Sequence, residues 1–189
     1  MTTLLRNYVS LENKLPTKSQ ESELMSVFVE GKQLPEQIFL EKFGSYMFFD
    51  ADIGSSKEML NAIMGLIFAE FGGDMSVKVF SSANWRLLGI VEKEIEWGGE
   101  ISGIGKALRD SGEYGGIILL DSLHRWVAYQ SRPVDMGVLA INGSVNVCDD
   151  DFFSCQDIAS WLEMKTDRDK SLVKGFGKRF LQALIKEYG

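Results

Sequence analysis

Hydrophobic and polar residues follow two different periods along this chain, and the periods divide it into helices and strands. Over residues 55–71 the apolar residues recur every three or four positions, which predicts an amphipathic helix. Ser55 or Ser56 is the expected N-cap, because Glu58 follows Ser55 at the spacing of a capping box. Gly72 and Gly73 are expected to end this helix.

Beyond residue 76 the apolar residues form short runs that are typical of strands. The runs cover residues 77–79, 85–91, 117–120, 124–130 and 136–141. Only short turns separate the last three runs, so they predict three consecutive antiparallel strands, a meander. A short helix over residues 101–108, ending near Gly112, is expected between the two groups of strands.

The remaining apolar positions complete the predicted fold. Helices are expected over residues 19–29, 35–43, 154–164 and 170–188, and a strand over residues 46–49. Pro35 suits a first helical turn, and Ser154 or Asp151 is the expected cap of the third of these helices. The last helix carries an apolar stripe of Leu172, Val173, Phe176, Phe180, Leu184 and Ile185. The pattern predicts one α+β domain over residues 1–189, a mostly antiparallel sheet of five or six strands with a central meander, covered by helices.

Charge is distributed unevenly along the chain. Residues 1–164 carry 13 Lys or Arg against 24 Asp or Glu, whereas residues 165–189 carry seven against three. The body therefore has a net charge of −11 and the last segment +4, within a total of −7. An acidic body repels nucleic acid and anionic membranes, and it favours a basic protein as partner. The basic segment is interpreted as a solvated helix face.

Two further features indicate where the protein acts. The N-terminal residues lack the basic start and apolar run of a secretory signal, and no apolar stretch of about 18 residues is present. Cys148 and Cys155 do not form a Cys-x-x-Cys pair. These features predict a cytoplasmic protein with reduced cysteines and no membrane partner.

Two short motifs resemble ligand-binding loops but depart from the required pattern. The run from Gly103 to Ala107 contains Gly-Lys, yet a phosphate-binding loop needs a glycine at Glu100 and a hydroxyl residue at Ala107. The run from Asp50 to Gly54 resembles the start of a calcium loop, but the positions for its glycine and its final acid are Ser55 and Asn61. No cofactor and no metal are predicted.

His124 is the only histidine, and it follows Asp121 and Ser122 within one predicted hairpin turn. Such residue types could make an acid–base site, which leaves a small enzyme using Asp121 and His124 as an alternative. A single turn is a poor scaffold for the geometry of nucleophile, base and orienting acid, and no Gly-x-Ser-x-Gly elbow is present. We therefore expect a protein without catalytic residues.

Two acidic groups are the predicted partner-binding residues. Glu92, Glu94 and Glu96 alternate with other residues, so an extended segment would place all three on one side. A second group comprises Asp149, Asp150 and Asp151. Both could form ion pairs with Lys or Arg of a partner. A charged sheet edge would explain the first group equally well, and a solvated loop leading into a helix N-terminus explains the second group better. Trp97 and Trp161 offer an apolar alternative.

The segment from Gly116 to Tyr129, followed by residues 137–141, resembles a pattern found in bacterial immunity proteins of polymorphic-toxin and contact-dependent growth inhibition systems. It comprises a strand, a turn at Asp121, a strand with Trp126 and a third strand. The resemblance implies a small, acidic, non-catalytic cytosolic protein that binds and neutralises a cognate toxin domain, often a basic nuclease. An adaptor domain that binds another host protein remains the third alternative.

Overall fold

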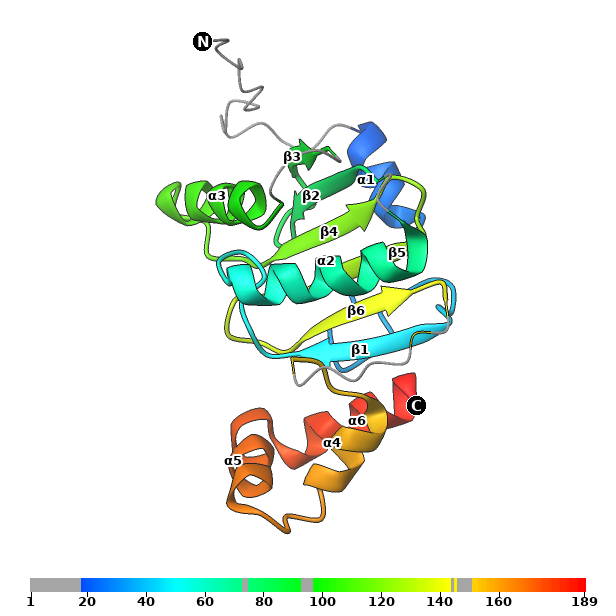
Figure 1. Ribbon diagram of the computed structural model, residues 1–189, viewed down its shortest axis with the longest axis vertical. Coiled ribbons are helices and arrows are strands. Elements are labelled where there is room, and N and C mark those ends of the chain that lie inside the picture. Colours follow the sequence, from blue (N-terminus) through cyan, green and yellow to red (C-terminus); the bar gives the residue numbers. More distant parts are fainter. Residues whose placement is uncertain (1–17, 73–74, 93–96, 144, 146–150) are drawn as a thin grey trace.

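The computed structural model describes residues 18–72, 75–92, 97–143, 145 and 151–189. Its centre is a six-stranded sheet with the order β1-β6-β5-β4-β2-β3, in which every neighbouring pair is antiparallel (Figure 1). The strands are β1 (Ser45–Phe49), β2 (Val77–Ser81), β3 (Leu87–Val91), β4 (Ile117–Asp121), β5 (Trp126–Tyr129) and β6 (Gly137–Ile141). The predicted α+β class is confirmed.

The predicted meander forms the middle of the sheet. Ala128 of β5 pairs with Leu119 of β4 on one side and with Leu139 of β6 on the other. Every residue of these three strands is buried. Apolar runs without alternation fit this position, because both faces of the central strands are covered.

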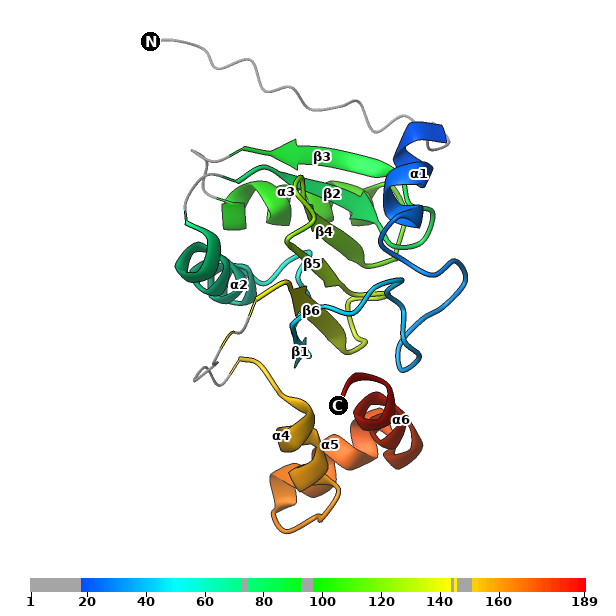
Figure 2. The same cartoon turned by 90° about the vertical axis from the view of Figure 1, so that its right-hand side faces the viewer.

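Six helices are present in the described residues. They are α1 (Lys18–Met25), α2 (Lys57–Phe71), α3 (Trp97–Asp110), α4 (Cys155–Trp161), α5 (Asp167–Phe176) and α6 (Lys178–Tyr188). Figure 2 shows α2 and α3 on one face of the sheet, and α1 with the α1–β1 connection, residues 26–44, on the other. The helices α4, α5 and α6 gather at the β1 edge (Figure 1).

Each face of the sheet has its own core. Along β5, Trp126 and Ala128 face α2 and α3, whereas Val127 and Tyr129 face the opposite core. Trp97, the first residue of α3, packs against Trp126 with ring centroids 6.2 Å apart. Trp97 and Trp161 are both buried, so neither supplies an exposed apolar anchor.

The polar residues predicted to begin helices do so. Ser56 caps α2 by accepting a hydrogen bond from the backbone N–H of Met59 at 3.2 Å. Ser154 caps α4 in a reciprocal capping box with Asp157. Helix α3 is longer than predicted, since it begins at Trp97 rather than at residue 101.

The predicted helix over residues 35–43 does not form. Its backbone groups pair with the chain just after α1 instead of with each other. The Val29 N–H donates to the Ile38 carbonyl at 2.8 Å, and the Leu40 N–H donates to the Val27 carbonyl at 2.9 Å. For the same reason the predicted helix over residues 19–29 ends at Met25, where the chain leaves to form this bridge.

The predicted helix over residues 170–188 is two helices. Gly177, between α5 and α6, has a φ of +90°, a conformation that glycine adopts readily and other residues rarely. The break rotates the apolar stripe, so that Leu181 and Leu184 of α6 are fully buried while Phe180 is only partly buried.

Candidate functional site

The two predicted acidic groups lie largely outside the described residues, which exclude Glu94, Glu96, Asp149 and Asp150. Glu92 is exposed just after β3, and Asp151 is exposed just before α4. Strand β3 ends at Val91 and helix α3 begins at Trp97, so Trp97 does not continue an extended row. The assignment of both groups to a binding face stays a prediction.

Asp121 and His124 have separate partners. The buried Asp121 carboxylate accepts hydrogen bonds from Arg125 Nε at 2.7 Å and Nη2 at 3.0 Å. His124 Nε2 instead lies 3.5 Å from Glu23 Oε1, which also pairs with Lys78 at 2.5 Å. The carboxylate that a catalytic dyad would need is therefore bound to a guanidinium group.

The glycine-rich stretch of α3 allows a close contact with the chain after β1. A Cβ atom on Gly105 would lie 2.0 Å from the carbonyl oxygen of Gly54. Gly105 therefore lies in the middle of a helix, packed against the segment that contains the calcium-loop motif. The motif from Gly103 to Ala107 is thus part of a helix, and the motif from Asp50 to Gly54 packs against that helix, so neither is a free ligand-binding loop.

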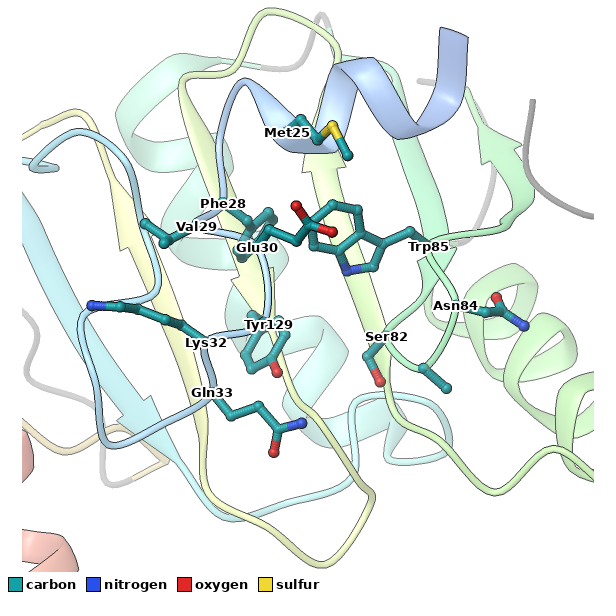
Figure 3. A pocket seen from close by; sticks show the side chains of 12 residues that line it. Met25, Phe28, Val29, Glu30, Lys32, Gln33, Ser82, Asn84, Trp85 and Tyr129 are labelled. Atoms are coloured by element: carbon teal, nitrogen blue, oxygen red, sulfur yellow. The ribbon is translucent and has the colours of Figure 1, made fainter. Parts of the chain in front are cut away.

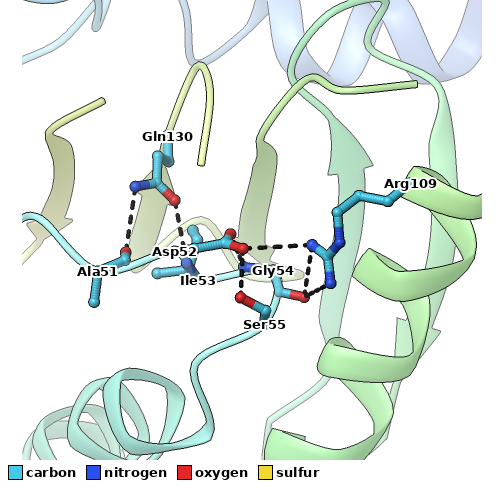
Figure 4. A network of polar contacts seen from close by, with 7 residues as sticks. All are labelled: Ala51, Asp52, Ile53, Gly54, Ser55, Arg109 and Gln130. Carbon is cyan, nitrogen blue, oxygen red and sulfur yellow. Dashed lines mark hydrogen bonds and ion pairs between the residues drawn. The ribbon is translucent and has the colours of Figure 1, made fainter. Parts of the chain in front are cut away.

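The segment from Asp50 to Ser55 is held by a polar network (Figure 4). The Asp52 carboxylate accepts from the Gly54 N–H at 2.8 Å and from Arg109 Nη1 at 3.4 Å. On its other side, the buried Gln130 amide accepts from the Ile53 N–H at 3.1 Å and donates to the Ala51 carbonyl at 3.2 Å. These contacts satisfy backbone polar groups of an irregular segment and hold it to Arg109 of α3 and to Gln130, the residue after β5.

A cavity of about 380 Å³ opens between the α1–β1 connection and the β2–β3 turn (Figure 3). Three aromatic residues from distant parts of the chain line it: Phe28, Trp85 and Tyr129. The Phe28 ring centroid lies 6.5 Å from that of Trp85 and 5.6 Å from that of Tyr129. Phe28 and Tyr129 are buried, whereas Trp85 is partly exposed.

A dense set of hydrogen bonds holds the turn that carries Trp85. Trp85 has a φ of +57°, which is uncommon for an aromatic residue. Its N–H donates to the Ser81 carbonyl at 3.0 Å, and the Ser81 N–H donates to the Arg86 carbonyl at 2.9 Å. Arg86 is buried and pairs with Glu113 at 3.0 Å, and Ser81 Oγ also donates to Glu113. The surrounding contacts therefore hold the backbone at Trp85.

Polar side chains line the rest of this cavity. Glu30, Lys32, Gln33 and Asn84 contribute to its walls. In Figure 3 the Glu30 carboxylate points toward Trp85, whereas the Lys32 amine extends away from it. Burial raises the pKa of the Tyr129 hydroxyl to about 12, with a further increase from Asp135, so this group is uncharged at neutral pH. The cavity thus combines aromatic faces with one carboxylate that points toward them.

A second cavity, of about 620 Å³, lies between the β5–β6 connection and the junction of α5 with α6. Its walls include exposed Val134 and the stacked rings of Phe176 and Phe180, whose centroids are 6.5 Å apart. Gln33 lines both cavities, so the two are neighbours along the same connection.

Sequence analysis did not find the aromatic cavity. Phe28 is in a segment that the apolar period assigns to a helix, and Trp85 is in a segment assigned to a strand. Phe28, Trp85 and Tyr129 come together only through the sheet order and the bridge between Phe28 and Phe39. No spacing in the sequence links them.

Comparisons with known proteins found no relative of this chain. No family model, curated protein or solved structure matches the chain. Within the described residues, no group of three or more His, Cys, Asp and Glu is placed to hold a metal ion. No helix among these residues is long and apolar enough to cross a membrane.

Proposed function

We propose that the protein is an immunity protein that binds a basic toxin domain, of the nuclease type, in the cytoplasm and neutralises it. The observation that carries this proposal is the net charge of −11 over residues 1–164. An acidic surface accelerates the encounter with a basic protein and disfavours binding of nucleic acid. The resemblance of the β4–β5–β6 segment to immunity proteins supports the same class.

The structure offers means of binding that suit such a partner. Exposed carboxylates occur on several elements, including Glu30, Glu58, Glu92 and Asp151. The aromatic cavity adds a recessed surface to these charges. Charged groups around an interface set the association rate, while buried aromatic contacts contribute more of the affinity.

The test is binding to the product of the gene directly upstream, which should be the toxin, measured as association and dissociation rates over a series of salt concentrations. We expect the association rate to fall as salt rises, because ions screen the attraction between opposite charges. Inhibition of the toxin's activity should follow the same binding curve. If the toxin is not bound at low salt, or is bound without being inhibited, the proposal is wrong.

Charge reversal tests the predicted binding face. One variant changes Glu92, Glu94 and Glu96 to Lys, and another changes Asp149, Asp150 and Asp151 to Lys. A control variant changes Glu163, Asp167 and Glu187 to Lys, which alters the net charge equally but at residues within or next to the basic C-terminal segment. The first two should slow association more than the control does. Equal effects of all three would mean that neither acidic group forms the interface.

A further inference from the structure

The aromatic cavity has the composition of a site for a planar cation. Cations are attracted to the faces of aromatic rings, most strongly to tryptophan. Trp85, Phe28 and Tyr129 supply three rings that line one cavity, and Trp85 is the partly exposed one of the three. Glu30 adds a negative charge to the same cavity.

The way in which Trp85 is held supports a binding role. Uncommon backbone conformations persist where the surrounding structure enforces them, and they cluster at binding and catalytic sites. The contacts of Ser81, Arg86 and Glu113 fix the turn with Trp85 at positive φ. The turn that carries Trp85 is therefore in place before any ligand arrives, and the ring packs beside Phe28, which lowers the entropy lost on binding.

We propose that this cavity receives an arginine side chain of the basic partner, with the guanidinium group stacked on Trp85 and paired with the Glu30 carboxylate. Arginine fits better than lysine because its planar, weakly hydrated group stacks on aromatic rings and binds a carboxylate through two parallel hydrogen bonds. The body's negative charge favours entry of a cation, and Lys32 extends away from Trp85 (Figure 3). This inference rests on the proposed function for the source of the arginine.

The first experiment uses a small probe and the whole protein. N-acetyl-arginine methylamide is titrated while the indole N–H signals of the tryptophans are followed by NMR. The Trp85 signal should shift as the probe is added, and the titration should give a dissociation constant in the millimolar range. The signals of Trp97 and Trp126 should not move, because both residues are buried on the other face of the sheet. The citrulline analogue, which has the same shape without the charge, should cause no shift.

Two variants make the test specific. Glu30→Gln should weaken binding of the arginine probe by roughly tenfold or more, because it removes the charged hydrogen-bond acceptor. Glu41→Gln removes an exposed carboxylate from the same connection but not from the cavity, so it should leave probe binding unchanged. If citrulline or the lysine analogue binds as well as arginine, or if Glu30→Gln binds as tightly as the wild type, the arginine site is refuted.

A second experiment uses the toxin and separates this inference from the proposed function. Glu30→Gln and Trp85→Leu should each accelerate dissociation of the toxin complex, while Glu41→Gln should not. A toxin complex that forms normally with both cavity variants would refute the arginine site and leave the immunity function intact. Probe binding at Trp85 without any toxin binding would keep the guanidinium site and reject the toxin as the source of the arginine.

Discussion

The hydroxyl of Tyr188 accepts a hydrogen bond from the backbone N–H of Ile38, 150 residues earlier in the chain, at 3.1 Å. The same hydroxyl donates to the Glu36 carbonyl at 2.7 Å. The Tyr188 ring also packs edge-on against Tyr46 and Phe48, with centroids 5.0 and 5.5 Å apart. Helix α6 therefore anchors the irregular α1–β1 connection, whose residues 28–33 line the aromatic cavity.

Replacing Tyr188 with Phe should destabilise the protein by about 1–3 kcal/mol, because it leaves the buried Ile38 N–H without its acceptor. Chemical denaturation measures this change in the free energy of unfolding. Amide exchange at Ile38 should accelerate more than exchange in β4. Tyr114→Phe is the control, since the Tyr114 side chain is exposed and its hydroxyl should contribute little. An equal effect of the two substitutions would show that the Tyr188 hydroxyl does not hold the connection.

Helix α3 and the segment after β1 approach each other most closely at Gly105, where a larger residue should destabilise the protein. Gly105→Ala places a Cβ atom 2.0 Å from the Gly54 carbonyl oxygen, so the helix or the segment must move. We expect a loss of about 1–3 kcal/mol of stability from this overpacking. Because the Asp52–Arg109 contact spans the same junction, it should loosen as well.

Gly65→Ala is the matched control for this substitution. Gly65 is also inside a helix, α2, but no heavy atom lies within 4 Å of the position that an added Cβ would take. Alanine there should stabilise the protein by about 0.5–1 kcal/mol through higher helix propensity. Thermal unfolding of both variants checks the contrast. Similar melting temperatures would mean that the junction adapts without strain.

The parts of the fold that follow local rules could be predicted from the sequence. The period and capping of α2, and the meander of β4, β5 and β6, depend on neighbouring residues along the chain, and both predictions were confirmed. The predicted helix over residues 35–43 was wrong because Ile38 and Leu40 pair with the chain after α1. Pairing of this kind is set by the tertiary structure, which overrides local propensity.

The aromatic cavity could not be predicted from local sequence patterns at all. Phe28, Trp85 and Tyr129 belong to three elements, and their convergence depends on the sheet order rather than on spacing in the sequence. The net charge, by contrast, is a property of composition and indicates a basic partner without the structure. The sequence thus predicts the kind of partner but not the pocket.

Replacing Asp121 should destabilise the protein more than replacing His124. Asp121→Asn removes the charge of a buried carboxylate that binds the partly exposed Arg125 guanidinium, and it should cost about 1–3 kcal/mol of stability because charged hydrogen bonds are lost. His124→Ala should change stability by less than about 1 kcal/mol and leave toxin neutralisation within a few fold of the wild type. Denaturation and toxin inhibition measure the two effects. A well-folded His124→Ala protein without neutralising activity would revive the enzyme alternative.

The break at Gly177 predicts which residues of α6 carry its packing. A continuous helix would bury Phe180, but in the structure Leu181 is fully buried and Phe180 lies partly exposed beside the second cavity. Leu181→Ala should therefore destabilise the protein by about 2–5 kcal/mol. Phe180→Ala should cost only about 1 kcal/mol, because part of its ring already contacts water. Denaturation that ranks Phe180 above Leu181 would support a continuous helix instead.

Alkaline pH should destabilise the protein through its buried tyrosines. Tyrosine ionises near pH 10 in an unfolded chain, whereas burial raises the pKa of Tyr129 to about 12 and raises that of Tyr188 as well. Between these values the unfolded state binds fewer protons than the folded state, so the free energy of unfolding falls as pH rises from about 10 to about 12. Urea denaturation over this range measures the slope. Tyr129→Phe should reduce this slope, whereas Tyr114→Phe, which changes an exposed side chain, should not. Identical slopes for the wild type and both variants would show that Tyr129 ionises equally in the folded and unfolded states.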